Sequence, residues 1–360
     1  MTNICFFSGD ITRGGGTEKV STMIANALAG QGKYRILVLS LVEQSGALFF
    51  ELHSDIKHYA LGDRWITPGP GYLKIIPKLR RFVEEQKIDV LIDIDIVLDV
   101  LSIPAVRKLD VKIISWEHFN YKYEMRSWYR RQILRYSVRR SDYIVTLTEE
   151  DRETYMKKTG RNQNICTIHN PIQEAARRPD VKKEKWLITV GHLIRRKGTD
   201  YLTEVALRVL EQCPDWKWLV VGSGEESVFL EKFIEKHQLT GRMILTGRTE
   251  DVNAYLEKSQ IYVMTSRSEG LPMCLLEAKA LCIPSVSFDI QTGPKEIIED
   301  GINGYLIPPF DCEEMAEKLK LLIYDEDLRA EFTKHAHSQI DKFRLENIVN
   351  SWNQILKAVL

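Results

Sequence analysis

Two glutamates, Glu269 and Glu277, stand eight positions apart in the stretch SEGLPMCLLEA. Pro272 predicts that a helix begins here, since a proline in the first helical turn lacks only an N–H that has no intrahelical partner. The amides of residues 270–273 would then point towards a bound phosphate. Glu277 is flanked by leucine and alanine, where an unpaired carboxylate would be costly, so we expect it to have a specific polar partner.

A cluster of cations, Arg195, Arg196 and Lys197, lies in the motif VGHLIRRKG, just after an apolar run. Cations at the carboxyl end of a strand can neutralise a diphosphate. A solvated basic loop explains the same residues, and on this motif alone it is the simpler interpretation.

Three glycines, at positions 14–16 of SGDITRGGGTEKV, stand between an apolar run and an amphipathic segment. Glycines allow backbone amides to approach an anion, and the start of a helix adds positive potential. The motif is neither GxGxxG nor a Walker loop, and a flexible strand–helix connection remains the alternative.

The elements that must position these residues are short apolar runs, which alternate with longer amphipathic segments along the whole chain. Runs that are apolar on both faces are typical of parallel strands covered by helices. The runs lie at 4–7, 35–41, 89–94, 111–116, 142–147, 164–169, 186–190, 216–221, 242–247, 261–266, 283–288 and 304–308. A polar, charged segment at 170–185 reads as a linker, so we predict two doubly wound α/β domains with the ligand site in the cleft between them.

Composition restricts the class of protein. The chain has 360 residues, with 50 basic and 50 acidic side chains that give a formal net charge of zero, which argues against a nucleic-acid partner. Its six cysteines form no CxxC pair and no zinc-spaced cluster. With no signal peptide visible and no apolar run near the roughly 20 residues of a membrane span, we expect a cytoplasmic protein.

The order of the motifs resembles that of family 4 retaining glycosyltransferases, which have the GT-B fold. The matching elements are the glycine-rich loop, G-x-L-x-x-x-K-G, V-G-x-G, S-x-x-E-G-x7-E and D-G-x-N-G-x-L-x-P-P. The resemblance covers nearly the whole chain and implies two Rossmann-like doubly wound domains that face each other across a cleft. We place the acceptor-binding domain at 1–171, joined by a C-terminal helix at 344–360 that crosses back, and the nucleotide-sugar-binding domain at 180–343.

Roles for individual residues follow from the same resemblance. Glu269 would accept hydrogen bonds from hydroxyls of the donor sugar, and Glu277 from both ribose hydroxyls. Lys197 would hold the diphosphate. His118, in SWEHFN, matches a histidine at the edge of the acceptor site, near the reacting face of the sugar. The implied catalytic residues are His118, Lys197 and Glu269.

The other positions that match the donor site would line the phosphates, the base or the sugar. They are Gly15, Gly16, His192, Arg196, Gly222, Arg248, Gly270 and Leu271. The family commonly carries arginine where this chain has His192, and a neutral imidazole is a weaker partner for a diphosphate than a guanidinium. Arg196 is then the candidate for the second cation.

The expected mechanism needs no metal. Asp93 and Asp95, in VLIDID, superficially resemble a DxD metal motif, but they lie on the acceptor side of the chain. Lys197 and the helix amides suffice to stabilise a departing nucleoside diphosphate. No carboxylate is obviously placed as a nucleophile, so the resemblance favours same-face displacement with retention at the anomeric carbon.

One segment is strongly basic and aromatic: RSWYRRQILRYSVRR, at 126–140, contains no acid. Arginines three or four positions apart line stripes on a helix, and such a helix suits an anionic membrane surface or a lipid-linked diphosphate. A solvated helix with its aromatics in the core is the alternative. The arginines predicted to form the acceptor or membrane surface are Arg126, Arg130, Arg131 and Arg135.

We therefore expect a retaining glycosyltransferase that moves a hexose or N-acetylhexosamine, without cofactor, from a nucleotide sugar carrying UDP. The expected acceptor is a glycan or a polyprenyl-diphosphate-linked glycan of a bacterial surface polysaccharide, used at the inner face of the plasma membrane. Two alternatives stay open: a non-catalytic protein that binds nucleotide sugars, and a nucleotide-sugar epimerase of the same fold.

Overall fold

The computed structural model describes residues 1–63, 70–172, 181–249 and 251–360 of the chain. The chain divides into two compact units, and each is described by itself. Unit 1 comprises Met1–Pro171 and Lys342–Leu360, and unit 2 comprises Ile172–Asp341.

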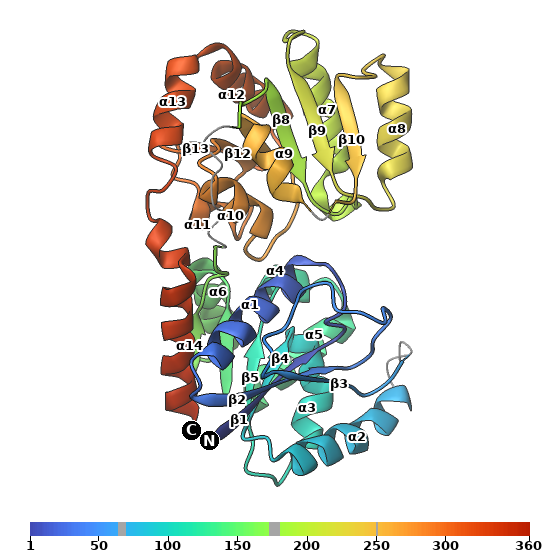
Figure 1. Ribbon diagram of the computed structural model, residues 1–360, viewed down its shortest axis with the longest axis vertical. Coiled ribbons are helices and arrows are strands. Elements are labelled where there is room, and N and C mark those ends of the chain that lie inside the picture. Colours follow the sequence, from blue (N-terminus) through green and yellow to red (C-terminus); the bar gives the residue numbers. More distant parts are fainter. Residues whose placement is uncertain (64–69, 173–180, 250) are drawn as a thin grey trace. The chain divides into compact units, whose positions relative to one another are not determined.

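Unit 1 is built on a seven-stranded parallel sheet in the order β3-β2-β1-β4-β5-β6-β7 (Figure 1). Its strands are β1 (Thr2–Ser8), β2 (Tyr34–Ser40), β3 (Lys57–Ala60), β4 (Val90–Ile94), β5 (Lys112–Trp116), β6 (Tyr143–Thr146) and β7 (Ile165–Thr167). Its helices are α1 (Gly16–Gly30), α2 (Pro70–Gln86), α3 (Asp99–Ala105), α4 (Tyr121–Glu124), α5 (Trp128–Arg140), α6 (Glu149–Thr159) and α14 (Leu345–Val359), with 3-10 turns η1 (Ile96–Leu98) and η3 (Ile340–Phe343).

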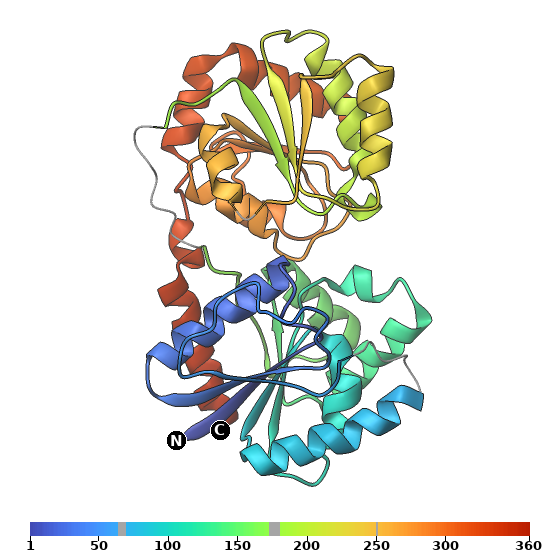
Figure 2. The ribbon, with the colours of Figure 1, turned by 45° about the vertical axis from the view of Figure 1, so that its right-hand side comes forward.

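Helices cover both faces of this sheet (Figure 2). Successive residues of a strand point to opposite faces, so Cys5 and Phe7 of β1 face one layer while Phe6 faces the other. Cys5 and Phe7 belong to a core that includes residues of α2 and α3. Phe6 lies 6.4 Å, between ring centroids, from Trp352 of α14, so the C-terminal helix completes the opposite face.

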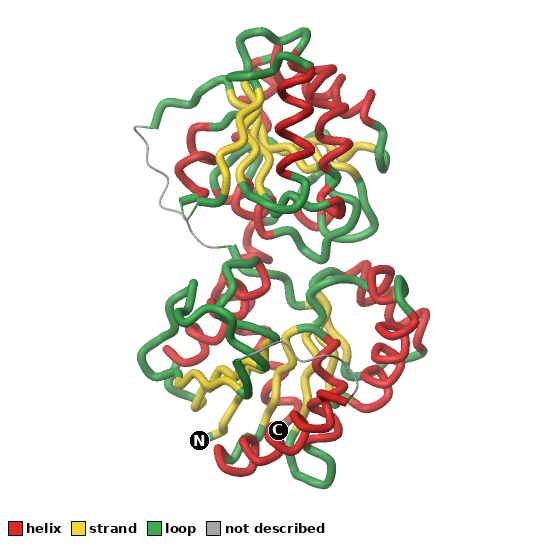
Figure 3. The backbone as a smooth tube through the Cα atoms, turned by 90° about the vertical axis from the view of Figure 1, so that its right-hand side faces the viewer, coloured by secondary structure: helices red, strands yellow, loops and turns green. Residues whose placement is uncertain are grey.

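Unit 2 is built on a six-stranded parallel sheet in the order β10-β9-β8-β11-β12-β13 (Figure 3). Its strands are β8 (Trp186–Val190), β9 (Lys217–Val221), β10 (Met243–Gly247), β11 (Ile261–Met264), β12 (Ser285–Phe288) and β13 (Gly304–Ile307). Its helices are α7 (Thr199–Leu210), α8 (Ser227–Lys236), α9 (Val252–Lys258), α10 (Met273–Ala280), α11 (Pro294–Ile297), α12 (Cys312–Tyr324) and α13 (Glu326–Lys334), with the 3-10 turn η2 (Arg195–Lys197).

The predicted fold class, two Rossmann-like doubly wound parallel sheets, is confirmed, and every predicted apolar run contains a strand. Strand β3 was not predicted, because KHYA is half exposed at the edge of the sheet and carries little apolar signal. Of the predicted linker 170–185, residues 173–180 lie outside the described part of the chain.

Candidate active site

A buried ion-pair cluster lies in unit 2, where two neighbouring parallel strands, β8 and β11, end. Lys197, in η2 after β8, places Nζ 2.6 Å from Oε1 of Glu269, in the loop after β11. Arg196 Nη1 lies 3.5 Å from the other oxygen, Oε2, and donates to the Ser268 carbonyl at 2.7 Å. The structure therefore brings together three of the residues predicted from the motifs.

Electrostatics keep Glu269 ionised. Burial by itself would raise the pKa of the Glu269 carboxyl, but Lys197 and Arg196 outweigh it, with hydrogen bonds from Lys197 and Ser266, and the pKa falls below its usual range. A carboxylate with only 6% of its surface exposed is thus held as an anion, with its oxygens ready to accept hydrogen bonds.

Two glycines with positive φ allow the loops to approach this closely. Gly198 has φ 70°, and a Cβ atom there would collide with the carbonyl of Thr265. Gly293, in the TGP turn after β12, has φ 102°, and a Cβ atom there would lie 2.7 Å from Pro272 Cδ and 2.8 Å from the Gly270 oxygen. The TGP turn therefore packs directly beneath the turn that carries Glu269.

The helix after Glu269 was predicted from Leu271, but α10 begins at Met273, two residues later. Pro272 is the N-cap of α10, and Gly270 and Leu271 lie buried in the turn before it. Glu277 is half-buried on α10. Burial raises the pKa of the Tyr262 hydroxyl well above its usual range, and the nearby Cys274 and both glutamates raise it further. Both acids thus act on the same buried hydroxyl group.

The other donor residues predicted in unit 2, His192, Gly222 and Arg248, lie just after the ends of strands β8, β9 and β10. His192 and Arg248 are exposed, in the loops after β8 and β10. Gly222, directly after β9, packs so tightly on the Gly191 carbonyl that a side chain would collide with it. The structure thus gathers these residues at the ends of the strands of unit 2.

A second ion pair, Arg267–Asp200, supports the Lys197–Glu269–Arg196 cluster and was not predicted from the sequence. Both guanidinium Nη atoms of Arg267 contact Asp200, at 2.7 and 2.6 Å, and the guanidinium lies 4.1 Å from the centroid of the Tyr201 ring. The Arg267 amide also donates to the Arg196 carbonyl at 2.9 Å. The sequence does contain one signal for this ion pair: Asp200 lies three residues after Lys197, in the first turn of α7, where an acid often has a structural partner.

The glycine-rich loop belongs to unit 1, where Gly15 is the N-cap of α1 and Gly16 its first residue. Glu18 reaches back to this helix start. Burial raises the pKa of its carboxyl, while hydrogen bonds from its own amide and that of Gly15, together with Arg13, oppose the rise. In this structure a carboxylate therefore already occupies the amide of Gly15 that was predicted to line a phosphate.

His118 also belongs to unit 1 and follows β5. Its ring lies 4.4 Å from the ring of Trp116, and within the described residues its Nε2 atom is buried without a hydrogen-bond partner. Burial lowers the pKa of His118 to about 3, so the imidazole is neutral at physiological pH. A buried polar atom that has no partner among the described residues calls for an explanation, and a hydrogen bond to a ligand hydroxyl is one.

The two aspartates of the DxD-like motif do not converge. Asp93 accepts a hydrogen bond from Ser102 at 2.7 Å, whereas Asp95 lies 3.5 Å from Arg130. Burial raises the pKa of Asp93 well above its usual range, and the neighbouring Asp99 raises it further. Asp93 therefore lies in the core of the sheet, hydrogen-bonded to Ser102, and does not share a site with Asp95.

Sequence comparisons decide the family. A family profile described as Glycosyl transferases group 1 matches residues 172–339, and one described as Glycosyltransferase Family 4 matches residues 14–175. The chain is 34% identical over 357 residues to an uncharacterized glycosyltransferase of Haemophilus influenzae, covering 99% of this chain and 100% of that protein. The chain belongs to glycosyltransferase family 4.

Two further relatives extend this comparison. The glycosyltransferase is 26% identical over 371 residues to the GalNAc-alpha-(1->4)-GalNAc-alpha-(1->3)-diNAcBac-PP-undecaprenol alpha-1,4-N-acetyl-D-galactosaminyltransferase of Campylobacter jejuni, covering 100% of this chain and 99% of that protein. The structure of the present chain superimposes on that of Anabaena HepE, which was solved in complex with UDP and glucose. The TM-score is 0.84 at 19% identity, and the match covers 98% of this chain and 99% of HepE. That likeness establishes the GT-B fold.

The predicted arginine surface of the glycosyltransferase is only half present. Arg126 and Arg135 are exposed on and before α5, beside Trp128, which is 73% exposed. Arg130 turns inward and pairs with the buried Glu124 at 2.8 Å. None of the helices in the described parts of the chain is long and apolar enough to cross a membrane.

Arg131, the fourth predicted arginine, also turns away from the surface and donates to the Met125 carbonyl at 3.1 Å. The prediction treated all arginines of the helix alike because no acid lies within 126–140. The acids that attract Arg130 come from other elements, which local sequence cannot reveal.

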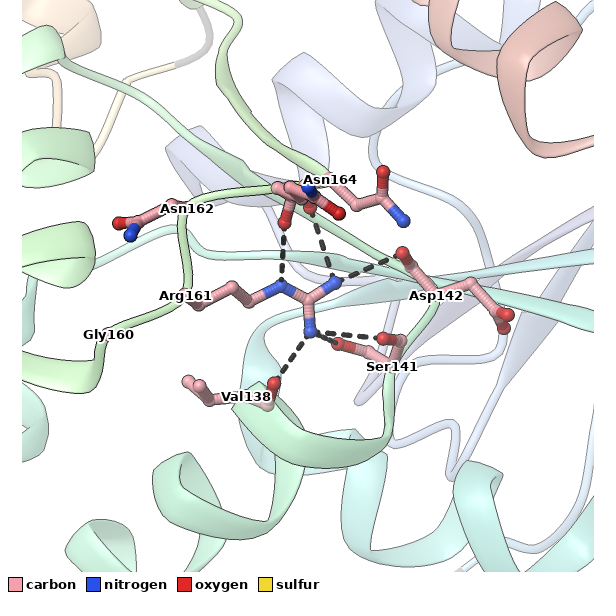
Figure 4. A pocket seen from close by; sticks show the side chains of 8 residues that line it. Val138, Ser141, Asp142, Gly160, Arg161, Asn162 and Asn164 are labelled. Atoms are coloured by element: carbon pink, nitrogen blue, oxygen red, sulfur yellow. Dashed lines mark hydrogen bonds between the residues drawn. The ribbon is translucent and has the colours of Figure 1, made fainter.

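A surface hollow of the glycosyltransferase lies at the end of α5 (Figure 4). Its lining residues are Val138, Ser141, Asp142, Gly160, Arg161, Asn162, Gln163 and Asn164. The Arg161 guanidinium donates to several backbone carbonyls, including that of Val138 at 2.6 Å. Because none of the predicted site residues lines this hollow and its cation is already hydrogen-bonded, we assign it a structural role.

Proposed function

We propose that this glycosyltransferase transfers a hexose or N-acetylhexosamine from a UDP-sugar, with retention and without a metal, to a glycan or polyprenyl-diphosphate-linked acceptor in bacterial surface polysaccharide synthesis. The observation that carries the proposal is the buried Lys197–Glu269 pair, with Arg196 beside it, at the carboxyl ends of β8 and β11. Ligands of doubly wound sheets bind at such strand ends.

In the proposed donor complex, Lys197 and Arg196 stabilise the negative charge that develops on the departing diphosphate. The amides of Gly270 and Leu271 assist. Glu269 holds hydroxyls of the sugar, and because it is ion-paired with Lys197 it is a poor nucleophile. This pairing favours same-face displacement, in which the acceptor oxygen attacks the side that the diphosphate leaves.

The relatives support the choice of donor and acceptor. The Campylobacter relative is named for a transfer to an undecaprenol-diphosphate-linked glycan, and HepE was solved with UDP and glucose. On unit 1, the neutral imidazole of His118 offers to an acceptor hydroxyl its Nε2 atom, which has no hydrogen-bond partner in the part of the chain that the structure describes. We place the acceptor beside it.

Ligand binding and turnover test the proposal separately. A panel of nucleotide sugars is screened by thermal shift, since a ligand at 100 times its dissociation constant stabilises the folded state by about 2.7 kcal/mol. Transfer to a polyprenyl-diphosphate glycan is then followed by NMR, with and without EDTA. An inverted anomeric centre, or activity lost with EDTA and restored by a divalent metal, contradicts the proposed mechanism.

The same screen separates the alternatives. A non-catalytic binder shows a thermal shift but no turnover, and an epimerase converts the UDP-sugar without an acceptor. Replacing Lys197 or Glu269 should abolish donor binding, whereas replacing His118 should leave donor binding intact and reduce transfer.

We also propose peripheral association with an anionic membrane through the exposed Arg126, Arg135 and Trp128. Co-sedimentation with anionic vesicles at low salt should fall several-fold when Arg126 and Arg135 are both changed to glutamate. The matched control is Arg208→Glu, an exposed position on unit 2. Equal sedimentation of both variants contradicts the membrane proposal.

A further inference from the structure

Within the described residues no hydrogen bond at Nε2 holds the His118 ring, so the backbone around His118 contributes to the position of its side chain. Its side chain packs against Trp116, and the ring nitrogen Nε2 has no hydrogen-bond partner within the described residues. Whatever fixes the segment from Glu117 to Glu124 therefore fixes the imidazole. That segment joins β5 to α4.

Buried polar side chains hold this segment along its length. Glu117 accepts hydrogen bonds from the Phe119 amide and the Tyr155 hydroxyl, both at 2.8 Å. Asn120 caps α4 by accepting from the Tyr123 amide at 2.9 Å. Each of these contacts acts on a residue just before or just after His118.

Acids from three elements crowd together beneath the segment. Carboxylate oxygens of Asp95, Glu117 and Glu124 all lie within 4.8 Å of one another. Two buried carboxylates and one half-buried carboxylate at this spacing repel each other unless a proton or a cation intervenes. Burial raises the pKa of Glu124 to about 7, and Arg130 opposes that rise.

Arg130 of α5 reaches into this cluster. One nitrogen, Nη1, lies 2.8 Å from Glu124 Oε1, and the other, Nη2, lies 3.5 Å from Asp95 Oδ2. The guanidinium also lies 5.4 Å from the ring centroid of Phe119 and 5.0 Å from that of Tyr123. The Arg130 side chain thus contacts Asp95, directly after β4, the rings of Phe119 and Tyr123, and the last residue of α4, Glu124.

We propose that Arg130 is a positioning residue for transfer: by bridging Glu124 and Asp95 and packing on Phe119, it holds the His118 segment in the conformation that binds the acceptor. The inference rests on the proposed placement of the acceptor beside His118. It assigns Arg130 a role inside unit 1, in place of the surface role that its position on a basic helix suggested.

The first test compares Arg130→Gln and Arg130→Lys with the wild type in full-length enzyme. The Michaelis constants for acceptor and donor, kcat, and the dissociation constant for UDP are measured. A displacement of about 1 Å in a reacting group costs on the order of a hundredfold in rate. We expect acceptor kcat/KM to fall at least tenfold in Arg130→Gln and less in Arg130→Lys, with UDP affinity within twofold of wild type.

A second readout does not depend on turnover. Diethyl pyrocarbonate acylates neutral imidazole, and mass spectrometry measures the labelling rate at His118. We expect labelling to rise at least fivefold in Arg130→Gln, because the buried ring becomes accessible. The matched control is Arg152→Gln, which removes an arginine from an ion pair with Glu149 elsewhere in unit 1 and should change neither readout.

If Arg130→Gln does not fold, Glu124→Gln tests the same bridge, since it removes one charge and keeps the side-chain shape. Labelling and acceptor kcat/KM within twofold of wild type in the folded variants overturn the inference, as does a loss of UDP affinity equal to the loss of acceptor kcat/KM. If the wild type transfers no sugar, the proposed function fails. The labelling experiment then decides by itself whether Arg130 holds the His118 segment.

Discussion

Replacing Lys197 by methionine removes the cation closest to Glu269 while keeping most of the side-chain volume. In the wild type the two groups lie 2.6 Å apart, and the side chain of Glu269 is 7% exposed. Without Lys197, the buried carboxylate keeps Arg196, at 3.5 Å. The variant therefore isolates the cost of leaving this charge poorly compensated.

The expected loss of stability follows from burial. Removing one partner of a buried ion pair typically costs about 3–5 kcal/mol, and because Arg196 remains we expect about 2–3 kcal/mol for Lys197→Met. Changing Glu269 to glutamine in the same chain removes the uncompensated charge, so Lys197→Met/Glu269→Gln should recover most of that loss. The exposed pair Arg208–Glu204, at 3.1 Å, is the matched control, and Arg208→Met should cost less than about 1 kcal/mol.

The pH dependence of the stability contributed by Glu269 should change sign in Lys197→Met. In the wild type the folded-state pKa of Glu269 is depressed, so its contribution is full above the ordinary value of 4.5 and is lost as the pH falls through the folded pKa. In Lys197→Met, burial dominates and raises that pKa above its ordinary value. The destabilisation should then shrink as the pH is lowered, because the carboxyl binds a proton in the folded state.

Urea unfolding read by pulsed hydrogen exchange of peptides from β8 and β11 measures unit 2 separately, which matters because a two-unit chain need not unfold in one step. Equal stability of Lys197→Met and the double variant would refute the argument, since the loss could not then come from a buried charge. So would a destabilisation of Lys197→Met that is independent of pH.

Three further predictions follow from single contacts. Gly293→Ala should weaken UDP binding at least tenfold and lower the free energy of unfolding by roughly 1–3 kcal/mol, because a Cβ atom at φ 102° would press on Pro272. An unchanged UDP affinity in calorimetry argues against this packing. Arg161→Met should lower the stability of unit 1 by about 2–3 kcal/mol, by leaving carbonyls such as that of Val138 without a donor, while UDP affinity stays constant; a drop in UDP affinity would show that the hollow is not merely structural. Burial lowers the pKa of His118 from 6.5 to about 3, so as the pH falls the unfolded state binds the proton before the folded state does. The wild type should therefore lose stability more steeply than His118→Gln as the pH falls from 6.5 to about 3, and parallel plots of stability against pH for the two proteins would contradict this.

The sheets could be predicted from the sequence because parallel strands covered on both faces are continuous apolar runs. WLITV and IYVMTS are examples, and they became β8 and β11. The strand KHYA was missed for the converse reason: at an exposed edge it has no need of such a run. The grouping of Lys197 with Glu269 was also accessible, since both directly follow predicted strands.

Which arginines of α5 reach the surface could not be predicted in the same way. The sequence predicts Arg126 and Arg130, four positions apart, on one stripe of a helix, but α5 begins only at Trp128, so Arg126 lies before the helix and is exposed while Arg130 is paired with Glu124. The difference is set by Asp95, from another element, and by Glu124, and such tertiary partners leave no trace in local spacing. The hydrogen bond from the Gly15 amide to Glu18, in contrast, is local in sequence. It was not predicted because the three glycines were interpreted as a loop that binds phosphate.

Unit 1 is assembled from two stretches of chain that are separated by all of unit 2. The ring of Trp352, on the C-terminal helix, lies 4.8 Å from that of Trp116, so the face of the sheet beneath His118 is finished only when α14 arrives. At about 5–20 residues per second, a ribosome needs on the order of 10–30 s to make the intervening residues. During that interval the nascent first unit carries an uncovered aromatic face, and the unit that begins to emerge first is the last to be completed.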